Sequence, residues 1–246
     1  MPSVLILGAT SAIARALAGE FASHRFDLIL AGRDREELGA LAADTSLRFG
    51  TKVQTLYFDI LDPDTSLTSL TPCIGGAGDE LAGVVLASGY LGEQTKAQTD
   101  LSEARLILET NFTGCVLALN VVAEHFEKRR KGFICALSSV AGDRGRQSNY
   151  LYGAAKGGLS IYLQGLRNRL SRSGVRVITV KPGFVDTRMT FGRPNLFLVA
   201  TPESVGRGIY KAIVRGNDVV YIPWFWRFIM LVLRVIPEKV FKRLHL

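Results

Sequence analysis

The chain has 246 residues, of which 48% are hydrophobic, and this length suits one well-buried α/β domain better than two. Its formal net charge is +8, yet no nucleic-acid module with interleaved basic and stacking aromatic residues is recognisable, so we expect no nucleic-acid partner. The three cysteines form no CxxC pair, and the residues after Met1 include no charged n-region, which predicts reduced core cysteines in a cytoplasmic protein without a signal peptide.

Short apolar runs alternate with helical patterns along most of the chain. This alternation predicts an α/β fold: a single-domain, Rossmann-type doubly wound parallel sheet with helices on both faces. The predicted strands are Val4–Leu7, Asp27–Ala31, Val53–Phe58, Gly83–Ala87, Phe133–Leu137, Val175–Val180 and Val219–Ile222.

The longest helical patterns are Leu101–Lys128 and Tyr152–Ser171, and Thr201 is a good N-cap for a later helix. The glycine-rich stretch Leu67–Asp79 is expected to be a loop. We expect residues 1–223 to form the catalytic domain and 224–246 to form an apolar and basic tail, packed on that domain or extending from it.

A glycine-containing turn follows the first predicted strand. Gly8 opens the segment Gly8-Ala-Thr-Ser-Ala-Ile-Ala14, and a helical pattern continues to Phe21. A strand, a tight turn and a helix in this order can place a pyrophosphate on the amino end of the helix.

The spacing of Ser139, Tyr152 and Lys156 predicts the chemistry. Tyr152 and Lys156 are four residues apart and share a helix face, so the ammonium is expected to favour the ionised phenol and lower its pKa. Ser139 could hydrogen-bond a substrate oxygen while Tyr152 exchanges a proton with it. Tyr150 lacks a lysine four residues on, and Ser138 is expected to face away across the strand end. With a hydride carrier, this is the chemistry of carbonyl and alcohol redox reactions.

In this order the motifs resemble those of short-chain dehydrogenases/reductases, and the resemblance runs from Gly8 to about Arg188. The usual turn of that family is Gly-x-x-x-Gly-x-Gly. Gly8 matches its first glycine, but Ala12 and Ala14 replace the other two and place methyl groups where the backbone would approach the phosphates. The resemblance implies cofactor contacts from the turn residues Gly8, Thr10, Ser11, Ala12 and Ile13.

Further segments match the family in part. Leu86-Ala-Ser-Gly89 stands where the family has Asn-Asn-Ala-Gly, Asn111 aligns with the helix asparagine of its proton relay, and Lys181–Thr187 resembles its Pro-Gly segment. The resemblance implies that Asn111, Ser139, Tyr152 and Lys156 are catalytic. It implies further cofactor contacts from Asp59, Ile60, Ala87, Gly89, Tyr152, Lys156, Pro182, Gly183, Val185 and Thr187.

The end of the second predicted strand bears on the choice of cofactor. Position 32 is Gly32, where an NAD-preferring protein would carry a carboxylate for the ribose 2′-hydroxyl, and Arg33 could bind a 2′-phosphate. We therefore expect NADP(H) to be preferred over NAD(H). The alternative is a solvated Arg33 beside Asp34.

A closer resemblance is to the bacterial subgroup of reductases that act on decaprenylphosphoryl 2-keto-erythro-pentose. It is carried by Ser138–Arg144, Val175–Val177, Pro182-Gly183, Thr187–Met189 and Arg227–Pro237. It implies a lipid-phosphate-linked keto-sugar as substrate, which Arg144 and Arg146 could bind, although loop arginines are often simply solvated. The alternatives are another carbonyl substrate, such as a 3-ketoacyl group or small ketone, and a non-catalytic NADP(H)-binding subunit at the membrane.

The tail contains the aromatic and aliphatic segment Trp224–Arg234, followed by basic residues. Its uninterrupted apolar run, Phe228–Leu233, is too short to span a bilayer. The segment could close the pocket, form a dimer contact, or lie in the interface at the cytoplasmic face of the membrane. We also expect a homo-oligomer, because relatives commonly pair through the long helices. The chain shows no ligand spacing for a metal.

Overall fold

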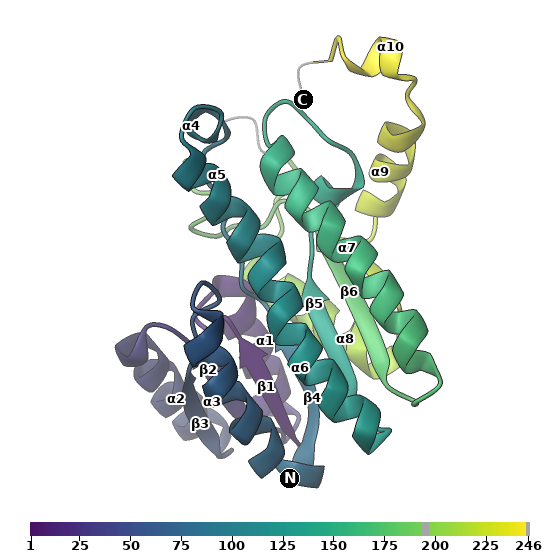
Figure 1. Cartoon of the computed structure of the whole chain (residues 1–246). Helices are drawn as coiled ribbons and strands as arrows, with labels where there is room; N and C mark the ends of the chain where they lie inside the picture. Colours follow the sequence, from purple (N-terminus) through teal and green to yellow (C-terminus); the bar gives the residue numbers. More distant parts are fainter. Residues whose placement is uncertain (193–196, 245–246) are drawn as a thin grey trace.

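The computed structural model describes residues 1–192 and 197–244, and its centre is a seven-stranded parallel sheet (Figure 1). The strands lie in the order β3-β2-β1-β4-β5-β6-β7, and the order reverses between β1 and β4. Each predicted strand is found, with ends within two residues of those expected. The bounds are β1 Ser3–Leu7, β2 Asp27–Gly32, β3 Val53–Tyr57, β4 Leu81–Leu86, β5 Phe133–Leu137, β6 Arg176–Pro182 and β7 Val219–Ile222.

Helices cover both faces of the sheet, as the doubly wound fold requires (Figure 1). In β1, Val4 and Ile6 join the core under one set of helices, whereas Leu5 and Leu7 join the core under the other, because successive strand residues point to opposite faces. The first set comprises α1 (Ala12–Ser23), α2 (Arg35–Phe49) and α8 (Pro202–Arg215). The second comprises α3 (Pro63–Gly76), α6 (Gly114–Arg129) and α7 (Tyr150–Ser171).

The stretch that was expected to be a loop is mostly helical, so that prediction was wrong. Helix α3 continues to Gly76, with Pro72 inside it, and a short 3-10 turn, η1, follows at Gly78–Glu80. Leu70 and Ile74 are buried against the sheet. Their spacing of four residues places both on one helix face, and the apolar burial outweighs the poor helix propensity of proline and glycine.

The predicted long helix Leu101–Lys128 is divided by a π-helical turn. Helix α5 (Leu101–Leu108) leads into the turn η2 (Glu109–Thr113) and then into α6. By length and composition alone, the helical stretch Leu101–Arg129 could cross a bilayer, but half of its apolar window is buried inside the fold. That burial is typical of a core helix in a globular domain.

The carboxyl-terminal segment packs on the domain beside the turn that follows β5. Helix α9 (Trp226–Val235) buries Trp226 and Met230 against Val140 of the turn η3 (Val140–Asp143). A short helix, α10 (Glu238–Phe241), follows. The last two tail residues, 245 and 246, lie outside the described part of the chain.

Candidate active site

The three central candidates meet at the carboxyl ends of the strands. Ser139 follows β5, while Tyr152 and Lys156 lie on α7 and are 9% and 2% exposed. The Ser139 side chain lies close enough to the Tyr152 hydroxyl to lower its pKa. The Lys156 ammonium lies 5.9 Å from the centre of the Tyr152 ring and donates a hydrogen bond to the Leu137 carbonyl at 3.0 Å. The fold therefore brings together a hydroxyl, a phenol and an ammonium from two elements.

Burial controls the protonation of this group. It raises the pKa of Tyr152 to about 12, and the neighbouring Ser139 side chain opposes that rise. Burial also lowers the pKa of Lys156. The expected lowering of the Tyr152 pKa by Lys156 is therefore not what the structure gives, because desolvation of the phenol is the larger influence. A protonated phenol at neutral pH is the form that can donate a proton to a carbonyl oxygen.

Close backbone packing positions the Ser139 turn on α7. A Cβ added to Gly142 would lie 2.6 Å from the amide nitrogen of Gly157, so only glycine allows this approach. Ser138 is buried, and its hydroxyl donates to the Lys156 carbonyl at 2.9 Å. Ser138 thus anchors the turn to the helix and leaves Ser139 beside Tyr152.

Asn111 lies in the π-helical turn and is completely buried. Its Oδ1 accepts from the Tyr90 amide at 3.1 Å, and its Nδ2 donates to the Tyr90 carbonyl at 2.5 Å. A Cβ added to Gly89 would lie 3.3 Å from Asn111 Oδ1 and 3.5 Å from Lys156 Nζ. Asn111 is therefore in the neighbourhood of Lys156, as a proton relay would need, and its side chain holds the loop after β4.

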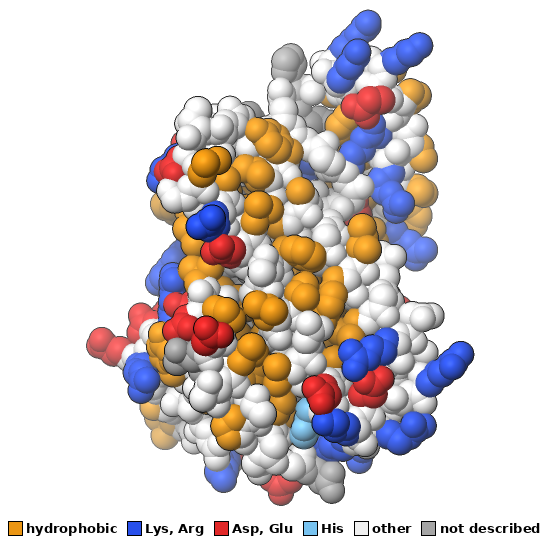
Figure 2. Space-filling model, viewed as in Figure 1, with side chains coloured by type: hydrophobic (Ala, Val, Ile, Leu, Met, Phe, Trp, Pro, Cys, Tyr) orange, Lys and Arg blue, Asp and Glu red, His pale blue; other side chains and the backbone are white. Residues whose placement is uncertain are grey.

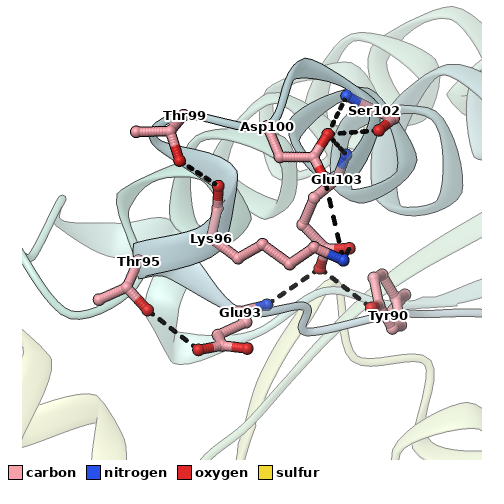
Figure 3. Close-up of polar contacts among 8 residues, drawn as sticks. All are labelled: Tyr90, Glu93, Thr95, Lys96, Thr99, Asp100, Ser102 and Glu103. Atoms are coloured by element: carbon pink, nitrogen blue, oxygen red, sulfur yellow. Dashed lines mark hydrogen bonds and ion pairs between the residues drawn. The ribbon is translucent and has the colours of Figure 1, made fainter.

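A polar cluster fixes the outer part of this loop (Figure 3). Buried Glu103 of α5 accepts from the Tyr90 hydroxyl at 3.0 Å and from the Glu93 amide at 3.1 Å. Lys96 Nζ lies 3.8 Å from carboxylate oxygens of both Glu103 and Asp100. The sequence contains a capping-box spacing, Asp100 to Glu103, which could have predicted the helix start. It carries no sign that Glu103 would be buried against this loop.

The turn after β1 has the shape that a pyrophosphate site needs. Gly8 has φ of +79°, and a Cβ there would lie 2.7 Å from the Ser88 amide nitrogen. Ser11 is the N-cap of α1 and accepts from the Ala14 amide at 3.3 Å. The amides of Ala12 and Ile13 lie in the first helical turn, where N–H groups have no intrahelical acceptor and can bind an anion. Thr10 precedes this cap, and its carbonyl accepts from Arg15.

The remaining nucleotide-side candidates surround the carboxyl ends of β2 to β4. Arg33 is exposed directly after β2, whereas Asp34 is engaged as the N-cap of α2 and accepts from the Glu37 amide at 2.9 Å. Asp59 and Ile60 follow β3, and Ala87 follows β4 and donates its amide to the Leu7 carbonyl at 2.8 Å. These positions form the edge of the sheet at which an adenosine moiety would be held.

The Pro-Gly segment leaves β6 beside the tail. Pro182 ends β6, and a Cβ added to Gly183 would lie 1.9 Å from Trp226 Nε1, so the indole packs directly on that glycine. Val185 is bridged to Ala200. The Thr187 amide donates to Thr190 Oγ1 at 3.1 Å. Gly183 therefore lies against α9, and Val185 and Thr187 follow it in the segment after β6.

Arg144, one of the two predicted substrate contacts, is engaged by the tail. Its Nη1 donates to the Leu233 and Ile236 carbonyls at 2.5 and 2.7 Å, at the carboxyl end of α9. Its Nη2 pairs with Glu238 at 2.9 Å, and the guanidinium lies 3.7 Å from the centre of the Phe241 ring. A substrate anion would have to compete with all of these contacts, so the structure favours Arg144 as the residue that fastens the tail.

Arg146, the other predicted substrate contact, has a side-chain nitrogen without a hydrogen-bond partner among the described residues. It is partly buried, its pKa is lowered by burial, and Nε is buried without a hydrogen-bond partner among the described residues. An anion beside Nε would supply the missing acceptor.

A buried ion pair, which the sequence analysis missed, lies behind the Ser139 turn. Lys181 of β6 forms a salt bridge with Asp143 of η3, and their side chains are 10% and 3% exposed. The Tyr221 hydroxyl donates to the other oxygen of Asp143 at 2.7 Å. A lysine inside an apolar strand pattern is the signal that could have suggested a buried acidic partner.

Comparison with known proteins identifies the family. The model of the short chain dehydrogenase family matches residues 2–194. The chain belongs to the short-chain dehydrogenase family. An uncharacterized oxidoreductase of Mycobacterium tuberculosis is 36% identical over 244 residues, covering 98% of this chain and 96% of that protein. A serine 3-dehydrogenase of Agrobacterium fabrum is 32% identical over 219 residues, covering 88% and 84%.

A solved structure of a short-chain dehydrogenase from Sphingobium yanoikuyae, in complex with NADPH, has a TM-score of 0.85 and 25% identity, and the match covers 97% of each chain. The present chain is thus a nucleotide-binding oxidoreductase of the short-chain dehydrogenase family, and the resemblance to this family drawn from the sequence is confirmed. The narrower resemblance to keto-pentose reductases is not confirmed by these matches.

Proposed function

We propose that this protein reduces a ketone to a secondary alcohol, and catalyses the reverse oxidation, with NADP(H). The observation that carries the proposal is the buried Tyr152 phenol, which lies near the Ser139 side chain and 5.9 Å, measured from its ring centre, from the Lys156 ammonium. In the reductive direction Ser139 orients the carbonyl oxygen and Tyr152 protonates it. Lys156 holds the nicotinamide ribose, and Asn111 completes the proton relay. The cofactor, when bound, supplies the hydride.

The preference for NADP(H) over NAD(H) is supported by the end of β2. Asp34 is engaged in capping α2, and this leaves exposed Arg33 as the charged side chain suited to a 2′-phosphate. In the turn after β1, Ala12 and Ile13 would hold the pyrophosphate through their amides. Asp59 and Ile60 would bound the adenine.

As substrate we propose a lipid-phosphate-linked keto-sugar. Two observations favour it: the unpaired buried Nε of Arg146, which suits an anion, and the exposed apolar surface of α9 beside the Ser139 turn. Another ketone, such as a 3-ketoacyl compound, is the competing substrate class. The protein would then be cytoplasmic and associated with the inner face of the membrane.

An assay of NADPH and NADH oxidation tests the reaction. Purified protein is given polyprenyl-phosphate keto-pentoses, the same sugars without lipid, 3-ketoacyl thioesters and small ketones. We expect the highest kcat/KM for the lipid-phosphate substrate with NADPH. Activity confined to short ketones would reject the substrate proposal, and NADPH binding without any hydride transfer would favour the non-catalytic alternative.

We also propose that the protein forms a homo-oligomer through the face formed by α5, α6 and α7. Hydrophobic side chains are visible on this face in Figure 2. The most exposed are Leu101 and Ile161, at 83% and 70%. Light scattering of the wild-type protein and of Ile161→Arg tests it, and we expect the variant to dissociate.

A further inference from the structure

Helix α9 carries a second apolar face that the fold does not cover. Its inner face is buried through Trp226 and Met230, so the direction of the outer face is fixed. The outer face begins with Trp224, which precedes the helix, and Trp224 packs edge-to-face on Phe228 at 6.0 Å. The exposed residues of this face are Trp224, Phe228, Leu231, Val232 and Val235, which are 72%, 58%, 57%, 61% and 69% exposed. Successive members are four, three, one and three residues apart, so they form one continuous stripe along the helix.

The stripe is bordered by positive charge. All five basic residues of the described tail are exposed, and none has an ion pair within the described ranges. The single acidic residue, Glu238, is paired with Arg144. In Figure 2 the Lys and Arg side chains gather around the end of the molecule that Figure 1 labels α9 and α10. The five residues are Arg227, Arg234, Lys239, Lys242 and Arg243.

We infer that this stripe docks on the surface of a bilayer that contains anionic phospholipid. A helix with aromatic and aliphatic side chains outward and arginines at its borders can bury the former among acyl chains while the latter stay at the headgroups. A second copy of the chain fits less well, because an isologous contact would bring the two sets of unpaired cations together. The charge thus favours an anionic surface over self-association.

Docking would also orient the active site. Val140 packs on Trp226 and Met230, and Arg144 holds the end of α9, so the stripe and the turn after Ser139 move as one unit. A bilayer against α9 would therefore lie beside the turn that follows Ser139. This orienting role depends on the proposed lipid-linked substrate, whereas docking itself does not.

Sedimentation with vesicles tests the docking. Wild-type protein is mixed with vesicles of phosphatidylcholine, with or without phosphatidylglycerol, at low and high salt. We expect binding to the anionic vesicles at low salt. Phe228→Ser combined with Leu231→Ser should weaken it about tenfold, because two large side chains lose contact with hydrocarbon. Leu47→Ser on α2, where Leu47 is 88% exposed, is the matched control and should leave binding unchanged.

The charge contribution is measured separately. Arg227→Gln and Arg234→Gln should each weaken binding to anionic vesicles about fivefold at low salt, with a smaller effect at high salt. Absence of wild-type binding to anionic vesicles at low salt would overturn the inference. So would stripe variants that change the oligomeric state by light scattering but bind vesicles as before. Reduction of a water-soluble ketone, assayed without vesicles, reports on the proposed reaction independently.

Discussion

The two sides of the candidate active site are built in different ways, and we call the side proposed to bind the cofactor the nucleotide wall and the side proposed to bind the substrate the substrate wall. The nucleotide wall consists of turns that directly follow β1, β2 and β3, and its key contacts are local, such as Ser11 with Ala14 and Asp34 with Glu37. The substrate wall joins residues far apart in the chain: Asp143 contacts Tyr221, and Arg144 contacts the carbonyls of Leu233 and Ile236.

This difference predicts which substitutions each wall can tolerate. The nucleotide wall relies on backbone amides and short side chains, so alanine at positions 12 and 14 is accommodated, with Ala14 fully buried. The substrate wall relies on charged and aromatic side chains with few alternatives. Substitutions there should therefore affect folding as well as activity, whereas those at the nucleotide wall should affect binding alone.

Tyr152, between the two walls, should give the largest effect. Tyr152→Phe should lower kcat about a thousandfold because the proton donor is lost, while the Kd for NADPH stays unchanged. Stopped-flow turnover and fluorescence titration measure the two quantities. Tyr150→Phe, at a half-exposed position two residues earlier, is the control and should leave kcat and the Kd for NADPH nearly unchanged. A Tyr152→Phe variant that keeps most of its activity would contradict the assignment of Tyr152 as the proton donor.

Asp143→Ala tests whether the substrate wall contributes to stability. It leaves the ammonium of Lys181, whose side chain is 10% exposed, without its partner, so the free energy of unfolding should fall by about 3 kcal/mol. Urea denaturation measures this. Glu238→Ala breaks a pair whose acidic member is 78% exposed and should cost less than about 1 kcal/mol. Equal losses would contradict the distinction between the buried and exposed pairs.

Arg33→Ala tests the nucleotide wall. Loss of a charge-assisted contact with the 2′-phosphate should raise the Kd for NADPH about tenfold or more and leave that for NADH nearly unchanged. Arg35→Ala, which removes a guanidinium 4.9 Å from the Tyr57 ring centre, serves as the control. An equal rise in Kd for NADPH and NADH would reject the 2′-phosphate contact. A fall in the free energy of unfolding would contradict the expectation that substitutions in the nucleotide wall affect binding alone.

The smallest predicted effect is a pH dependence of stability. The Tyr152 pKa is raised to about 12 in the folded state, against about 10 when unfolded, so its neutral form is favoured by folding. Its contribution is therefore complete below pH 10 and is lost as pH rises from about 10 to 12, reaching a loss of about 1.4 kcal/mol at pH 11. Between pH 8 and 11, the free energy of unfolding measured by urea denaturation should fall by about 1.4 kcal/mol more for wild type than for Tyr152→Phe. If the free energy of unfolding changes with pH equally in the two proteins, the phenol is not buried as described.

Much of the molecule could be predicted from local patterns. Alternating apolar runs located all seven strands, because burial between two helical layers demands continuous hydrophobic segments. The four-residue spacing placed Tyr152 and Lys156 on one helix face, and the family resemblance placed Ser139 near them. Helix α3 was missed because its stabilisation comes from Leu70 and Ile74 on the sheet and not from its own propensities.

The sequence by itself determined the fold class, because apolar runs alternate with helical patterns along most of the chain, and the family, because its motifs occur in order from Gly8 to about Arg188. Only the tertiary structure decided that Arg144 fastens the tail, that Trp226 packs on Gly183, and that burial sets the Tyr152 pKa. These depend on which distant segments meet and how much water they exclude. Both are properties of the packed molecule, and no short segment of the chain carries them.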